Sequence, residues 1–208
     1  MRTRTPAAGD PGPLRSFDPT LVGRLESAAW VAYYQRQWGR LLLTSLRLLH
    51  QAFGLDWART AHAAWLVLRA QQRWAPYPRN DPDAARRSMR RFYALLRLAH
   101  GGPADPSRAA ALEVDWWAAH RCDQHRGDEH QPGGAGGHAV AGALARLYAY
   151  LYGTDEAAVA PAAQERAAAM ALSDEWVAQG CPPGSPLLAA ERAALVRSYA
   201  SLLAAVHR

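Results

Sequence analysis

The sequence contains no lysine and no isoleucine, only two cysteines, and no long apolar run. Cys122 and Cys181 are too few for a disulfide framework or a four-thiolate zinc site, so we expect a reducing, cytoplasmic environment. No segment approaches the roughly 20 apolar residues that span a bilayer. Residues 1–16 lack the apolar stretch of a secretion signal. We therefore expect neither a membrane protein nor a secreted precursor.

Several motifs of common enzymes are also missing. The sequence has no G-x-x-x-x-G-K-[S/T], no G-x-S-x-G and no H-E-x-x-H, and no G-x-G-x-x-G follows a strand. Phosphate-binding loops, hydrolase elbows, zinc-protease helices and dinucleotide-binding folds depend on these spacings. The remaining options are chemistry carried out inside a helical bundle, or a protein without enzymatic activity.

What the sequence does contain is typical of helices. Alanine, leucine and arginine account for 45, 25 and 24 of the 208 residues. Apolar residues recur at spacings of three and four, and β-branched residues do not alternate with polar ones as they do in a strand. Four expected helix starts place a capping side chain before a proline, which suits the first helical position. They are Asp18-Pro19, Asp81-Pro82, Asp105-Pro106 and Ser185-Pro186.

These signals predict an all-α, single-domain bundle of about seven helices, most of them antiparallel to their neighbours because the connections are short. Residues 1–16, rich in proline, glycine and arginine, are expected to form a disordered tail before a bundle domain of residues 17–208. A flexible loop is expected near residues 127–137, which end in QPGGAGG. The expected helices cover residues 18–52, 55–75, 82–99, 106–126, 138–153, 161–179 and 186–206.

A short internal repeat identifies candidate site residues. Residues 25–33 and 112–120 both follow the pattern L-E-x-x-x-W-x-A-[Y/H]. At about 100° per residue, the Glu, the Trp and the final Tyr or His of each copy fall on one helical face, which overlaps the apolar face. We therefore expect an internal pocket that acts on a small molecule. Its lining would be Glu26, Trp30, Tyr33, Glu113, Trp117 and His120.

Carboxylates and imidazoles from facing helices are ligands for iron, manganese or zinc. In this interpretation Tyr33 and His120 take part in catalysis by a metal-dependent oxidoreductase. The two-helix pattern is similar to part of the ligand sets of ferritin-like and haem-oxygenase-like di-iron proteins. It contains no Glu-x-x-His pair, so the similarity implies a type of metal site and no family membership. The metal ligands would be Glu26, Glu113, His120 and Asp174.

The same residues allow a second interpretation, a buried network without a metal. Buried carboxylates are costly unless they are paired, and Glu26 and Glu113 can pair with arginines from the basic helices. Tyr33 and His120 are then ordinary hydrogen-bonded residues of the core. The two interpretations differ in what neutralises the carboxylates.

A second candidate site is a basic surface. Residues 36–97 contain twelve arginines and three aspartates. Such a surface binds anions, so the alternative function is a non-enzymatic interaction module or homo-oligomer that binds an acidic partner. No helix-turn-helix, zinc-finger or RNA-binding signature accompanies it, and we do not expect nucleic acid as the partner. The arginines at helical spacing are Arg86, Arg87, Arg90 and Arg91.

Overall fold

The computed structural model describes residue 14 and residues 16–126 and 136–207. Within these ranges the chain forms eight α-helices and no strand, which confirms the prediction of an all-α bundle. None of the described helices is long and apolar enough to cross a membrane. The helices are α1 (Pro19–Tyr34), α2 (Trp38–Phe53), α3 (Trp57–Trp74), α4 (Pro82–His100), α5 (Pro106–Arg126), α6 (Gly136–Tyr152), α7 (Glu156–Ala178) and α8 (Pro186–Val206).

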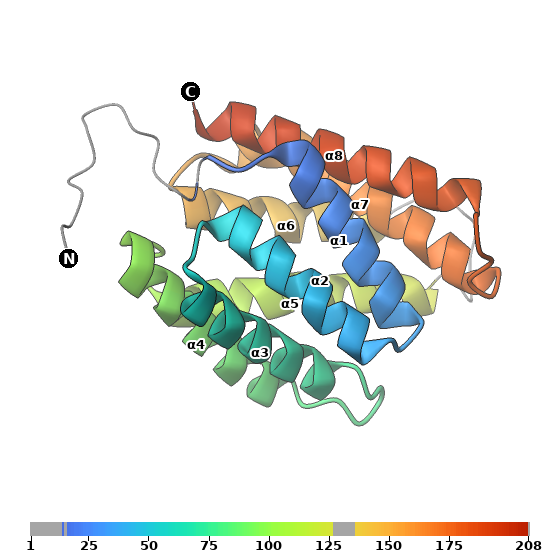
Figure 1. Ribbon diagram of the computed structural model, residues 1–208. Coiled ribbons are helices and arrows are strands. Elements are labelled where there is room, and N and C mark those ends of the chain that lie inside the picture. Colours follow the sequence, from blue (N-terminus) through green and yellow to red (C-terminus); the bar gives the residue numbers. More distant parts are fainter. Residues whose placement is uncertain (1–13, 15, 127–135, 208) are drawn as a thin grey trace.

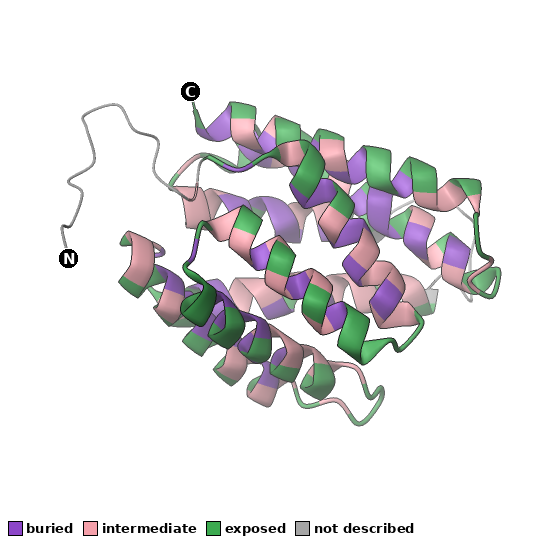
Figure 2. Cartoon of the chain, viewed as in Figure 1, coloured by how far each residue is buried: buried purple, intermediate pink, exposed green. Residues whose placement is uncertain are grey.

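The helices form a closed ring. Each helix packs against its neighbours in the sequence, and α8 packs back against α1. In Figure 1, α7 and α8 lie along one side of the molecule and α3 and α4 along the opposite side, with α2 between them at the front. Buried residues of the helices face the interior of the ring, and exposed residues face outward (Figure 2). All eight helices can therefore contribute side chains to one interior.

Two apolar clusters fill most of this interior. One cluster contains residues of α2, α3, α4 and α5, among them Phe92, Leu96 and Val114. The other joins α6, α7 and α8 and includes Leu144 and Leu202. Burial of these side chains supplies the main driving force for folding. The core is therefore divided between the two halves of the ring.

The four helix starts that place a capping residue before a proline lie where the sequence predicts them. The Asp18 carboxylate accepts hydrogen bonds from the backbone N–H groups of Thr20 and Leu21 at 2.8 and 3.2 Å. Asp81, Asp105 and Ser185 accept equivalent bonds at 2.8, 2.8 and 3.3 Å. Each side chain satisfies an N–H that has no partner inside the helix.

The predicted helix over residues 18–52 is wrong in one respect, because the chain breaks it into α1 and α2. Arg36 adopts a left-handed conformation with φ of 56°. The N–H of Gln37 then bonds to the carbonyl of Ala32 at 2.8 Å, which closes the end of α1. Helices commonly end this way with a glycine in the left-handed position. Since an arginine stands there instead, the sequence gives no sign of the break.

The start of α7 also differs from the prediction. The helix begins at Glu156, five residues before Pro161, which lies inside the helix on an exposed surface. The predicted tail lies outside the described residues except for residues 14 and 16. The predicted loop lies outside them over residues 127–135, and α6 begins at Gly136, within its last two residues.

A close approach of α1 and α8 makes Gly23 sensitive to substitution. A Cβ at Gly23 would lie 2.9 Å from the backbone nitrogen of Val196. We expect Gly23→Ala to destabilise the protein by about 1–3 kcal/mol in urea denaturation, since overpacking forces the helices apart. As a control, Gly142 lies inside α6, and its Cβ would meet only the Arg146 guanidinium at 3.6 Å. Gly142→Ala should stabilise the protein by up to about 1 kcal/mol, and equal destabilisation by both changes would contradict this view of the packing.

Candidate functional site

A cavity of about 340 Å³ lies inside the ring and is lined by residues of all eight helices. It lies between the two apolar clusters, since its wall includes Phe92 and Leu49 from one cluster and Met170 and Leu202 from the other. Small-molecule sites in proteins have volumes of about 300–1,000 Å³. The cavity is therefore large enough to hold an organic molecule.

The cavity wall is rich in aromatic residues. Thirteen of the chain's nineteen aromatic residues contribute to it. Ring faces supply apolar contact area, and tyrosine and tryptophan edges add hydrogen-bonding groups. The thirteen aromatic residues of the wall are Phe17, Trp30, Tyr33, Tyr34, Phe53, Trp74, Phe92, Tyr93, Trp116, Trp117, Tyr148, Tyr152 and Tyr199.

The structure brings the six candidate residues of the internal repeat to this one cavity. Three come from α1 and three from α5, helices that are not neighbours in the ring and contribute to the cavity from different parts of its wall. Helical periodicity placed the polar groups of each copy on its inner face, and the ring closure places the two faces around a common space. These residues are Glu26, Trp30, Tyr33, Glu113, Trp117 and His120.

Glu26 is neutralised by an arginine of α7. Its carboxylate forms a buried ion pair with Arg166 and accepts a hydrogen bond from the hydroxyl of Tyr199 at 2.6 Å. Arg166 also donates to the Tyr148 hydroxyl oxygen at 2.9 Å, and its guanidinium carbon lies 5.4 Å from the ring centre of Trp116. The Glu26 carboxylate thus lies in a dense network that joins α1, α5, α6, α7 and α8.

The electrostatics of this network favour the ion pair. Burial alone lowers the pKa of Arg166, but the charge of Glu26 and the hydrogen bond to Tyr148 raise it well above its ordinary value. Burial also raises the pKa of Tyr199, and the neighbouring Glu26 charge raises it further. The guanidinium therefore stays charged and the Tyr199 hydroxyl stays protonated, which keeps both as donors to the carboxylate.

Glu113 has a different environment. Its carboxylate accepts a hydrogen bond of 2.7 Å from the hydroxyl of Tyr93, and among the described residues no cationic side chain lies at ion-pair distance from it. Burial raises the pKa of Glu113, while Tyr93, the more distant charge of Arg166 and the indole groups of Trp116 and Trp117 lower it in part. Glu113 is therefore a cavity-lining carboxyl without a counter-ion of its own.

His120 lies against an aspartate of α7. Its Nε2 is 2.9 Å from Asp174 Oδ2, and Gln124 donates to the other oxygen of Asp174 at 2.7 Å. A carboxylate can only accept, so in the neutral imidazole the proton lies on Nε2 and Nδ1 is the basic nitrogen.

Two tyrosines complete this end of the cavity. Burial raises the pKa of Tyr33, and burial together with the Asp174 charge raises the pKa of Tyr34. Both phenols therefore remain protonated around neutral pH. Arg121, which also lines the cavity, donates to the backbone carbonyl of Trp74 at 2.9 Å and lies over the Trp74 ring.

The four predicted metal ligands do not gather into one group in the described structure. Among the residues that the structure describes, no group of three His, Cys, Asp or Glu side chains is close enough to hold one ion. Glu26 lies with Arg166, and His120 with Asp174. The geometry gives no support to an iron, manganese or zinc site. It agrees with the second interpretation in one respect, because Glu26 pairs with an arginine. That arginine comes from α7 and not from the basic helices.

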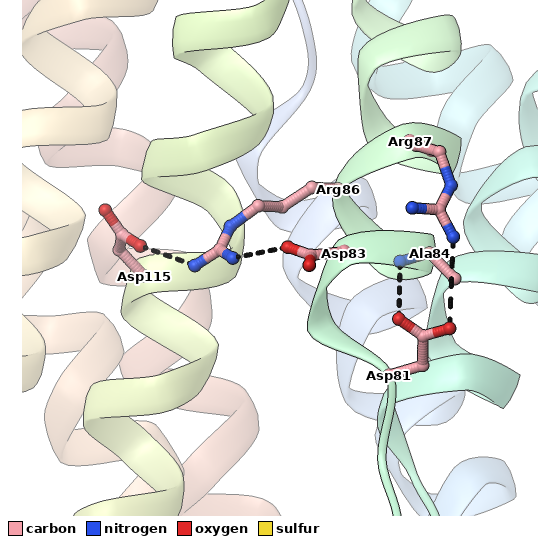
Figure 3. Close-up of polar contacts among 6 residues, drawn as sticks. All are labelled: Asp81, Asp83, Ala84, Arg86, Arg87 and Asp115. Atoms are coloured by element: carbon pink, nitrogen blue, oxygen red, sulfur yellow. Dashed lines mark hydrogen bonds and ion pairs between the residues drawn. The ribbon is translucent and has the colours of Figure 1, made fainter.

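The basic surface on α4 is partly neutralised. Arg86 lies 3.1 Å from Asp83 and 3.5 Å from Asp115 of α5, and Arg87 lies 3.9 Å from Asp81 (Figure 3). The contact with Asp115 joins residues 29 positions apart, so the helical spacing within α4 could not predict it. Two of the four arginines therefore have acidic partners within the molecule.

The other two arginines of this surface, Arg90 and Arg91, are exposed, and no ion pair holds either of them within the described part of the chain. Exposed arginines of this kind are normal on a helical surface and form only weak pairs. An acidic partner for this surface stays a prediction.

Several important residues of the site escaped the sequence analysis. Arg166 and Glu191 each belong to a Glu-Arg pair inside an alanine-rich stretch, and such a pair is the signal that could have found them. Tyr93, Tyr148 and Tyr199 carry no such signal, because tyrosine fits an apolar helical face equally well without a partner. Their roles depend on which helices meet.

Glu191 is a further carboxyl, fully buried in α8. One oxygen accepts a hydrogen bond from the Ser27 hydroxyl at 2.7 Å, and the other accepts none within the described part of the chain. Burial raises the pKa of Glu191 to about 7, with a further contribution from the nearby charge of Glu26. This group therefore titrates near neutral pH inside the bundle.

The fold and the site define a class of protein, a closed ring of helices around an aromatic cavity with buried hydrogen-bonding groups. Comparison of the chain with protein-family models, curated proteins and solved structures finds no significant match.

Proposed function

We propose that this protein binds a small organic molecule with a mainly apolar or aromatic body in the cavity inside the helical ring. The observation that carries the proposal is the cavity itself, about 340 Å³ in volume and lined by all eight helices. Protein interiors are otherwise packed to crystal density, with few voids larger than a water molecule. A molecule bound in a space of this size would supply the van der Waals contacts that close-packed interiors otherwise make.

The lining supports binding of an organic molecule. Aromatic side chains are thirteen of the thirty-two lining residues, and polar groups occupy defined positions among the aromatic and aliphatic ones. Known ligand sites combine these same two features, in which apolar surface supplies affinity and a few polar groups fix the orientation. Here the polar groups in contact with the cavity include Glu113 and, near Tyr33, His120, which is paired with Asp174.

A neutral fluorescent probe, N-phenyl-1-naphthylamine, tests this function. We expect saturable binding at one site per chain. Ala29 and Ala52 line the cavity, so a larger side chain at either position occupies ligand space. Ala29→Leu and Ala52→Leu should each weaken binding at least about tenfold, the equivalent of 1.4 kcal/mol.

The matched control is Ala61→Leu, since Ala61 is exposed on α3 and does not line the cavity. This variant should bind the probe as the unmodified protein does. Circular dichroism and thermal melting of each variant establish that it is folded. Probe binding that is absent from the unmodified protein, or that survives both cavity substitutions, would disprove the proposed function.

A further inference from the structure

The two glutamates of the internal repeat differ in their partners. Glu26 of α1 forms an ion pair with Arg166, whereas the hydrogen-bond donors close to Glu113 of α5 among the described residues are neutral. Both side chains line the same cavity. The negative charge of Glu26 is thus balanced by a direct ion pair, whereas Glu113 has no ion pair of its own among the described residues.

The arginines of the cavity wall cannot easily serve Glu113, because each is held elsewhere. Arg166 is bound by the Glu26 carboxylate and the Tyr148 hydroxyl. Arg121 is bound by the Trp74 carbonyl and lies between the rings of Trp74 and Tyr77, with its guanidinium carbon 4.5 and 5.5 Å from their centres. Both cations are therefore committed within the described structure.

Aromatic groups surround the Glu113 carboxylate. The Tyr93 hydroxyl donates to it, and the indole groups of Trp116 and Trp117 lie close enough to lower its pKa. The rings of Trp116 and Trp117 meet edge to face with centres 6.1 Å apart, and Tyr93 packs edge to face on Phe92 at 5.1 Å. Aromatic faces attract cations through their electron density, so a carboxylate set among them is suited to an organic cation.

We propose that the ligand of this cavity is an amine, bound as its protonated cation with the ammonium group against Glu113 and its apolar body against the aromatic wall. This inference depends on the proposed function and adds the chemical class of the ligand. The ammonium group supplies the counter-ion that the protein does not provide. A neutral molecule of the same shape would leave the carboxylate uncompensated in a water-poor site.

The raised pKa of Glu113 agrees with this arrangement. Burial without a counter-ion disfavours the charged form of a carboxyl, and a cation nearby favours it. A bound ammonium group would therefore reverse the effect of burial.

Matched pairs of small molecules test the inference. The probes are 2-phenylethylamine with 2-phenylethanol and tryptamine with tryptophol, each measured by displacement of N-phenyl-1-naphthylamine and, independently, by isothermal titration calorimetry. Each pair keeps the ring and exchanges an ammonium group for a hydroxyl. We expect the unmodified protein to bind each amine at least about tenfold more tightly than its alcohol, since charge-assisted hydrogen bonds are the stronger kind.

Glu113→Gln keeps the shape and the acceptor for Tyr93 but removes the charge. We expect this variant to lose the preference for amines, bringing the ratio close to one, while its affinity for the alcohols changes little. Glu165→Gln is the matched control, because Glu165 pairs with Arg197 at the outside of the bundle. It should keep the full preference for amines.

The outcomes separate the two proposals. Equal binding of amines and alcohols by the unmodified protein overturns the amine inference and leaves the proposed function intact. A preference for amines that persists in Glu113→Gln also overturns it. If none of the four compounds binds, by displacement or by calorimetry, the amine inference is contradicted. If the naphthylamine probe itself does not bind, the proposed function is contradicted.

Discussion

Replacing Arg166 with methionine is expected to destabilise the protein by about 3–5 kcal/mol. The change removes the partner of a glutamate whose side chain is only 5% exposed, and the Glu26 carboxylate then keeps only the hydroxyl of Tyr199. Methionine fills a similar volume, so the loss reports the uncompensated charge more than a cavity. Urea denaturation followed by circular dichroism measures the free energy of unfolding.

Two further variants identify the cause. Arg197→Met breaks the ion pair with Glu165, in which the arginine side chain is 58% exposed, and should cost under about 1 kcal/mol. The double variant Glu26→Gln with Arg166→Met removes the orphaned charge and should recover much of the lost stability. A double variant as unstable as the single one would show that the network acts through packing and not through charge.

The stability of the protein should fall as the pH rises through the range in which Glu191 titrates. Its carboxyl has a pKa of about 7 in the fold, against an ordinary value of 4.5. Between these values the folded chain holds a proton that the unfolded chain has released, so the free energy of unfolding decreases with pH. From pH 4.5 to above pH 7 this group alone removes on the order of 3 kcal/mol.

Glu191→Gln isolates this contribution. The amide stays neutral and its oxygen can still accept the hydrogen bond from Ser27. We expect the variant and the unmodified protein to be similarly stable near pH 5 and the variant to be clearly more stable at pH 8. Glu175→Gln changes an exposed carboxyl of α7 and should leave the pH profile unchanged. A constant difference between Glu191→Gln and the unmodified protein across this pH range would contradict the assignment.

The buried network also bears on the cavity. Arg166 connects side chains of α1, α5 and α6, and Tyr199 connects α8 to the same carboxylate. Polar networks of this kind fix the relative positions of helices more closely than apolar contacts do, because hydrogen bonds are directional. Loss of Arg166 should therefore also weaken binding of the naphthylamine probe.

Local features of the sequence determined the helices and their inner faces. A capping side chain before a proline fixes a helix start through contacts within one turn, and Asp18 and Asp81 both make them. Helical periodicity is equally local, which is why Glu26 and Glu113 were placed on the faces that now line the cavity. The same reasoning failed at Arg36, where the left-handed end of α1 has no glycine to mark it.

Only the tertiary structure decided which side chains meet. Glu26 and Arg166 are 140 residues apart, and no local rule distinguishes Arg166 from the arginines of the basic helices as the partner. The pairing follows from the ring, in which α8 closes against α1 and brings α7 close enough for Arg166 to reach that carboxylate. The difference between a neutralised Glu26 and an unbalanced Glu113 has the same origin. Their sequence contexts are alike, and whether each one meets a cation depends on helices far away along the chain.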